Sequence, residues 1–280
     1  DLFIPDVMAD AIAGQLAGRQ ALGGTGAFTI EPGLPEGQRG GNTVNVPYFG
    51  HLGELESRTD GQALTVATLT SSAETATVVR YGKAFEITNW AQRAAGGQDP
   101  YAEGARQIVD AVVRQLDKAA LTAALTTTLA VSKPTEALAY GHFVDLLDLF
   151  GDEQDDVVAF AVHSKILASL RNVKDGSNRL MFVDARENGQ PMILGRPVFV
   201  SDKHTVTADG GGVGVPSYTT LAVKRGAGVL WTTGTPSVDT DKDILADSKV
   251  AAINLYYAPH LYKRFPGGTK IGAAKLVTKA

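Results

Sequence analysis

The residues whose types could carry out chemistry are the histidines, a serine next to one of them, and a cluster of carboxylates. Histidine is a common metal ligand and general base, but a metal site needs several ligands at short, regular spacing. No two of the five histidines stand at such a spacing: His51, His142, His163, His204 and His260. The chain has no cysteine, which excludes disulfides, thiolate metal sites and a cysteine nucleophile. We therefore expect no metal site and no cofactor.

Ser164 follows His163 in the segment AVHSKILASLRN, and a serine beside a histidine suggests an activated nucleophile. The nucleophile elbow of α/β hydrolases, however, has a glycine on each side of the serine, and this segment has neither. Ser164 is better placed to cap the helix that SKILASLRN predicts. Because no triad of serine, histidine and acid can be assembled from the sequence, we expect no catalytic residue. An α/β hydrolase is only a remote alternative.

A carboxylate cluster and a glycine run are the remaining candidates for ligand binding. The cluster lacks the glycine and the alternating ligands of a calcium loop; it comprises Asp152, Glu153, Asp155 and Asp156. The run GGGVG at 210–214 has no lysine after it and no helix whose N-terminus could hold a phosphate. Both are predicted to be solvated loops. Trp90 and Trp231 stand beside strand-forming residues and are predicted to be packing anchors.

Composition indicates a folded protein without a nucleic-acid or membrane signature. The chain has 280 residues, 44% of them hydrophobic and 20% charged, which suffices to bury a sizeable core. Its net charge is −4 and its pI is about 5.8, so no general affinity for nucleic acid is expected. No apolar run approaches the roughly 18 residues that a membrane-spanning helix needs.

The strongest local signal is the stretch 99–130, which predicts one long helix that braces the other elements. Asp99 can cap its free N–H groups and Pro100 fits the first helical position, whereas the threonines at 126–128 predict fraying at the other end. Apolar residues recur at helical spacing along one face: Ala105, Ile108, Val109, Val112, Leu116, Ala119, Ala120 and Ala123. The opposite face carries Arg106, Asp110 and Arg114 and should meet water or a partner.

Residues 43–88 predict a projecting two-stranded flap. Val44, Val46 and Tyr48 alternate with polar residues, and strand-forming residues return between Thr75 and Ile87. The intervening segment is too long for a tight hairpin turn. Because an isolated two-stranded ribbon is marginal in water, we expect the flap to lie on a neighbouring molecule.

The flanking segments predict an irregular arm and an α/β region. Residues 21–42 contain so many glycines and prolines that no regular structure is expected there. After Pro134, helices around 140–150 and from Ser164 alternate with a buried strand at 157–162, and further strands follow. The tail from Val250 is long enough for a strand that returns to the first region.

The order of these parts resembles the major capsid proteins of tailed double-stranded DNA bacteriophages, which have the Hong Kong 97-type fold. Three stretches are similar to capsid sequences: AVHSKILASLRN, ILGRPVFVSD and DTDKDILADSKVAAINLYY. The resemblance implies an α+β fold with an extended β-hairpin loop, a spine helix and an α/β axial domain. Its expected divisions are an N-terminal arm (1–41), the extended loop (42–89), a peripheral domain with the spine helix (90–134), the axial domain (135–247) and return strands of the peripheral domain (248–280).

The resemblance also implies a function: a structural protein, not an enzyme, that assembles as hexamers and pentamers into an icosahedral shell around phage DNA without sequence-specific binding. Expected partners are a portal, a decoration or cementing protein, and a scaffold or maturation protease. A start at Asp1 without methionine is consistent with proteolytic removal of a scaffold segment. Assembly would take place in the host cytoplasm and the product would be the virion. An encapsulin shell that encloses cargo enzymes is the alternative within the same fold.

Subunit contacts are expected from the flap tip and the polar face of the long helix: Leu52, Glu54, Leu55, Glu56, Arg58, Leu64, Leu69, Arg106 and Arg114. Some members of the family join subunits by an isopeptide bond between a lysine in the extended loop and an asparagine. Here the tip from His51 to Ser72 has no lysine, the first being Lys83, and the guanidinium of Arg58 stays protonated and cannot be the nucleophile. We therefore expect the shell to be locked without covalent bonds.

Overall fold

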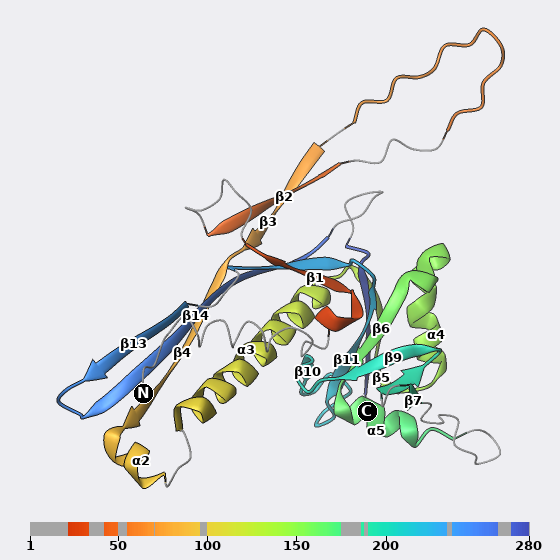
Figure 1. Ribbon diagram of the computed structural model, residues 1–280. Coiled ribbons are helices and arrows are strands. Elements are labelled where there is room, and N and C mark those ends of the chain that lie inside the picture. The colour runs from red at the N-terminus through yellow and green to blue at the C-terminus, as the bar shows by residue number, and fades with distance from the viewer. Residues whose placement is uncertain are drawn as a thin grey trace.

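The computed structural model describes residues 22–33, 42–49, 55–69, 71–95, 100–174, 186–187, 190–233, 237–262 and 270–279. These residues form a five-stranded sheet, an eight-stranded sheet, one long helix and a two-stranded ribbon that projects from the body (Figure 1). The expectations for residues 1–21, for the cap at Asp99, and for His51, Leu52 and Glu54 lie outside the described residues.

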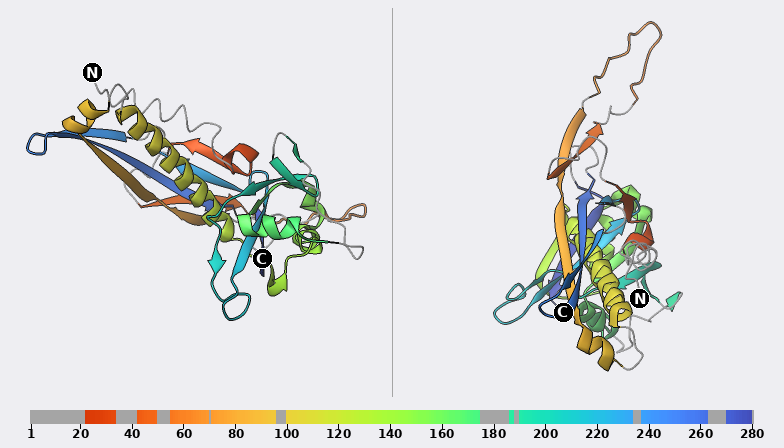
Figure 2. Two further views of the ribbon diagram at one scale, coloured as in Figure 1. Left: turned by 90° about the horizontal axis from the view of Figure 1, so that it is seen from below. Right: turned by 60° about the vertical axis from the view of Figure 1, so that its left-hand side comes forward.

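The long helix α3 (Pro100–Leu125) lies along the five-stranded sheet (Figures 1 and 2). Its apolar face is buried as the spacing predicts, with Val109 and Leu116 at 1% and 2% exposure. The helix ends directly before the threonines, and the Thr127 hydroxyl donates to the carbonyl of Lys270 at 2.8 Å. Gly104 allows the close approach of helix and sheet, because a Cβ there would lie 2.6 Å from the Phe85 ring.

The five-stranded sheet is organised by its longest strand, β14 (Ser248–Leu261). On one side β14 pairs antiparallel with β4 (Val79–Thr88). On the other side it pairs with β13 (Ser237–Asp243) and then with β12 (Gly228–Thr232), also antiparallel. Strand β1 (Phe28–Pro32) completes the sheet in parallel with β12. The return of the tail to the first region is thus the pairing of β14 with β4.

Strand β1 corrects the expectation that residues 21–42 have no regular structure. Phe28 is buried at 2% exposure, and the backbone from Phe28 to Pro32 pairs with the edge of β12. Gly26 and Gly33 have φ angles of 74° and 110°, so they bend the chain before and after the strand. The glycines are turn residues at the two ends of a strand that the sheet edge stabilises. A short 3₁₀ helix, η1 (Gly23–Thr25), precedes it.

The eight-stranded sheet forms the second part of the body, at the right of Figure 1. Its main order is β5 (Leu129–Ala137), β15 (Ala273–Lys279), β11 (Ser217–Lys224), β6 (Val157–Val162), β9 (Arg196–Val200), β8 (Gln190–Ile193) and β7 (Arg186–Glu187), and β10 (Val206–Thr207) pairs with β11. Helices α4 (Gly141–Asp148) and α5 (Ser164–Arg171) pack on it, with Phe143 and Phe160 edge to face at the centre of that core.

Strand pairing crosses several of the expected domain divisions, which themselves stay a prediction. Residues 228–243 were expected in the axial domain, but β12 and β13 pair with β14 in the five-stranded sheet. Residues 273–279 were expected among the return strands of the peripheral domain, but β15 pairs with β5 and β11 in the eight-stranded sheet. Alternating apolar residues identify a strand without identifying its partner, because both sheets offer the same kind of apolar face.

Two local expectations for polar residues are also corrected. The cap of α5 is His163 and not Ser164, because the His163 Nδ1 accepts the backbone N–H of Lys165 at 3.1 Å. The carboxylate cluster lies in the 3₁₀ helix η2 (Gly151–Asp156) and is exposed, but it is not merely solvated. Glu153 forms an ion pair with the buried Lys224, whose Nζ also lies 4.9 Å from the centre of the Phe150 ring. The cluster is therefore held to the core at one point.

His204, buried at 4% exposure in the segment after β9, should make stability depend on pH. Burial, and then the charge of His163, lowers the pKa of His204 from 6.5 to about 4. As the pH falls from 6.5 to 4, the unfolded chain therefore takes up a proton that the folded chain does not. We expect the free energy of unfolding to fall by on the order of 3 kcal/mol across this window, and by less in His204→Gln. Denaturant unfolding at several pH values checks this, and parallel pH profiles for the two proteins would contradict it.

Candidate functional site

The described residues do not assemble a catalytic centre from the candidates in the sequence. No three histidine, aspartate or glutamate side chains gather there as a group that could hold a metal ion. The Ser164 Oγ lies 3.5 Å from His163 Nδ1, but that nitrogen already accepts the backbone N–H of Lys165. No helix in the described part of the chain is long and apolar enough to cross a membrane. The candidate functional features are instead exposed apolar side chains at two ends of the molecule.

The flap tip, residues 55–69, is the first of these ends. Figure 1 shows it as an extended loop far from the body. Five of the predicted contact residues lie on it. The three leucines are exposed, Leu55 at 103%, Leu64 at 60% and Leu69 at 53%, and Val66 is also exposed, at 91%. Glu56 and Arg58 are exposed as well. Arg58 Nη2 donates to the carbonyl of Gln62 at 2.6 Å, so its guanidinium helps to hold the turn at the tip.

The base of the flap is anchored to the body. Strands β2 (Thr43–Phe49) and β3 (Ser71–Thr77) pair antiparallel, which confirms a two-stranded flap. The flap is shorter than the predicted 43–88, because β4 (Val79–Thr88) pairs with β14 in the five-stranded sheet. The buried Val44, Val46 and Ala76 of β2 and β3 pack on Val229, Trp231 and Ala258 of the five-stranded sheet. Trp231 is thus the packing anchor that the sequence predicts, and its Nε1 donates to Glu31 at 2.9 Å. The described part of the flap is therefore a stem that packs on the body and an exposed apolar tip.

The second end lies at the opposite side of the molecule, where β13 turns into β14, and sequence reasoning missed it. Trp90, Ile244 and Leu245 are 80%, 81% and 100% exposed. The turn at 244–247 is joined to α2 (Asn89–Ala94), because the Asn89 backbone N–H donates to the carbonyl of Asp247 at 3.0 Å. The expectation that Trp90 is a packing anchor is therefore wrong, since neighbouring strand formers do not ensure that a side chain faces the core. In the sequence, the adjacent Ile244 and Leu245 within a polar turn are the signal that could have predicted this exposed end.

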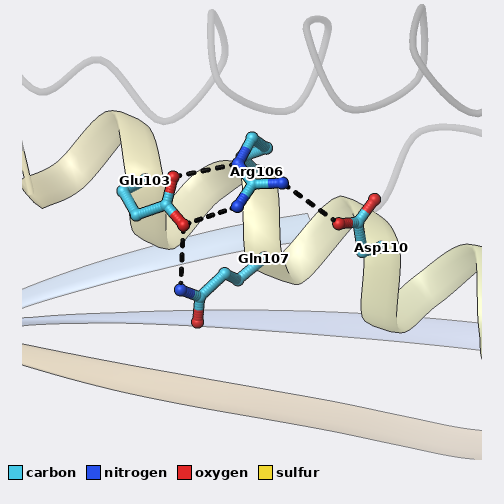
Figure 3. Close-up of polar contacts among 4 residues, drawn as sticks. All are labelled: Glu103, Arg106, Gln107 and Asp110. Atoms are coloured by element: carbon cyan, nitrogen blue, oxygen red, sulfur yellow. Dashed lines mark hydrogen bonds and ion pairs between the residues drawn. The ribbon is translucent and has the colours of Figure 1, made fainter.

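The polar face of α3 carries the two remaining predicted contact residues. Arg106 donates to both carboxylate oxygens of Glu103, at 2.6 and 2.9 Å, and lies 3.5 Å from Asp110 (Figure 3). Hydrogen bonds from Arg106 and then Gln107 lower the pKa of Glu103 to about 2. The sequence placed Arg106 and Asp110 on this face, whereas Glu103, which forms the closer (i, i+3) pair with Arg106, was missed. Arg114 lies on the same exposed face, and its backbone carbonyl accepts from Lys203 Nζ at 2.6 Å.

Part of the sequence and most of the fold are similar to known proteins. Residues 102–215, from α3 to the loop before β11, match the phage capsid family. No curated protein matches significantly. Among solved structures, a chain of Microbacterium phage Oxtober96 is similar at 14% identity and a TM-score of 0.65, over 92% of this chain and 91% of that one.

Two further solved structures agree. The capsid of Ralstonia phage GP4 is similar at 12% identity and a TM-score of 0.69, over 91% of this chain and 87% of that one. The capsid of an empty GTA particle is similar at 15% identity and a TM-score of 0.65, over 93% and 89%. At such identities the likeness is one of fold, and it confirms the expected α+β architecture of the Hong Kong 97 type.

Proposed function

We propose that this chain belongs to the phage capsid family and is the major subunit of an icosahedral shell that encloses a double-stranded DNA genome. The observation that carries the proposal is the exposed flap tip, which holds Leu55, Leu64, Val66 and Leu69 away from its own body. Monomeric proteins do not usually extend such a segment into water without a partner. A second copy of the chain is the partner that a self-assembling shell supplies.

The two exposed ends fit heterologous contacts between identical subunits. If the tip of each copy binds a different surface of the next copy, the repeated rotation from one subunit to the next can close into a ring. Hexamers and pentamers are rings of this kind. Fully burying a leucine or valine contributes about 1.5–3 kcal/mol, so each tip that docks adds several kcal/mol to association. Arg106, Arg114, Glu56 and Arg58 are proposed to border these contacts. The distal end with Trp90 and Leu245 is proposed as a further contact, because its side chains are equally exposed.

The contents of the shell are proposed to be phage DNA and not cargo enzymes. The matched family is that of phage capsids, and the similar structures named above come from phages and a GTA particle. The net charge of −4 supports enclosure without sequence-specific binding. Assembly in the host cytoplasm, and partners such as a portal, a scaffold or maturation protease and a cementing protein, belong to the same proposal.

The purified protein should form closed particles of megadalton mass in negative-stain images. After boiling, these particles should run on a denaturing gel as a single band near 29.4 kDa, because the described flap tip has no lysine to form an isopeptide bond. Particles from the native source should contain nuclease-protected DNA. A monodisperse monomer or dimer would contradict the proposed function. A ladder of boiled oligomers would contradict only the non-covalent lock, and a protein cargo in place of DNA would favour an encapsulin.

A further inference from the structure

A broad hollow of about 790 Å³ lies against the polar face of α3 and collects cations from three elements. Lys83 comes from β4 and Lys203 from the segment after β9. The helix supplies three more: Arg106, Arg114 and Lys118. Asp110 is the one carboxylate among the described residues that line the hollow. The charge of this surface is therefore positive, although the whole chain has a net charge of −4.

Ion pairs with carboxylates neutralise only part of this charge. Glu103 and Asp110 pair with Arg106, at 2.6 and 3.5 Å (Figure 3). The ion pairs between described residues engage none of the other four cations. Burial lowers the pKa of Lys203, and the charges of Arg114 and Lys118 lower it further against the opposing effect of Asp117. The cations are thus close enough to interact, and an anionic occupant would relieve their repulsion.

A phosphodiester backbone has the charge and the spacing that this row of cations requires. From Arg106 to Lys118 the helix advances about 12 positions, or about 18 Å at the helical rise. One strand of duplex DNA carries a phosphate about every 3.4 Å along the axis, so this length faces about five phosphates. Arginine and lysine side chains bind phosphate oxygens through charge-assisted hydrogen bonds. The row can therefore contact several phosphates of one strand at once.

The flap tip of another copy fits this hollow less well. Residues 55–69 contain two carboxylates, Glu56 and Asp60, and Arg58 stands between them. The large exposed apolar side chains of the tip would also have to lie against cations. Such a segment would leave most of the cations without an opposite charge. A polyanion supplies an opposite charge at every step along the row.

We propose that this hollow binds the phosphate backbone of the enclosed DNA without reading its sequence, through Lys83, Arg106, Arg114, Lys118 and Lys203. The inference rests on the proposed function, because it assigns the polyanion to the genome inside the shell. Phosphates are common to all sequences, so the hollow holds any segment of the genome equally well. Each phosphate that a cation neutralises releases counterions, and binding therefore weakens steeply as the salt concentration rises.

Lys83→Gln with Lys118→Gln tests this, because both lysines are exposed and lie outside the proposed subunit contacts. Fluorescence anisotropy of a labelled DNA duplex, titrated with the unassembled full chain, measures the affinity at several salt concentrations. We expect the variant to bind about tenfold more weakly at about 50 mM salt, and the slope of log K against log salt to fall by about two units. Two duplexes of unrelated sequence should give the same result. The control Lys174→Gln with Lys242→Gln removes the same charge from exposed lysines elsewhere and should leave affinity and slope unchanged.

Equal affinities and slopes for the two double variants would overturn the inference. Lys83→Arg with Lys118→Arg keeps both charges and should bind DNA as the unaltered chain does. Negative-stain images of the same proteins separate this test from that of the proposed function, since an unaltered chain that forms no particles contradicts the shell itself. If Lys83→Gln with Lys118→Gln abolishes particles without changing DNA binding, the hollow contacts an acidic surface of another subunit, and the inference is overturned.

Discussion

Val112→Gly is expected to abolish shell assembly. Val112 lies in the middle of α3 at 7% exposure and packs in the core between the helix and the five-stranded sheet. A glycine inside a helix costs about 1 kcal/mol, and loss of the buried valine side chain adds roughly 2 more. This sum is a large fraction of the 5–15 kcal/mol that typically separates folded from unfolded protein. The substitution would therefore destabilise helix α3, which packs against both sheets.

Denaturant unfolding of the isolated subunit and the yield of particles in negative-stain images measure the effect. Thr122→Gly is the matched control, since this threonine is exposed on the same helix and its replacement removes no core contact. The control should assemble. Particles formed by Val112→Gly at the normal yield would show that α3 does not brace the subunit as inferred.

Deleting residues 55–69 is expected to leave a folded subunit that no longer forms stable shells. In the described structure these residues are all exposed, and no strand of the body pairs with them. The stem of the flap keeps its own contacts, because Val44, Val46 and Ala76 remain on the sheet. Circular dichroism and thermal unfolding should thus match the intact subunit, while size-exclusion chromatography should show the loss of particles.

A substitution experiment separates the apolar contacts of the tip from its length. Leu55→Ser with Val66→Ser should weaken assembly, whereas Thr65→Ser with Thr68→Ser, equally exposed in the same segment, should not. If the deletion variant instead unfolds as a monomer, the tip belongs to the subunit core and not to a contact between subunits.

The sequence by itself determined the elements whose signals are local. The apolar spacing of α3, the alternation of β2 and the missing lysines of the flap tip are all readable without a structure, because each depends on neighbours along the chain. The order of these elements also sufficed for the resemblance to capsid proteins, which the family match and the fold support.

The tertiary structure decided what depends on distant partners. Strand β1 forms in a glycine-rich segment only because the edge of β12 offers hydrogen bonds, and β12 and β15 join sheets that no local pattern distinguishes. Trp90 is exposed while Trp231 is buried, although both have strand formers beside them. Lys83 of β4, Arg114 of α3 and Lys203 of the segment after β9 line one hollow only once these elements pack. A sequence records which charges and apolar side chains are present, and packing determines which of them meet.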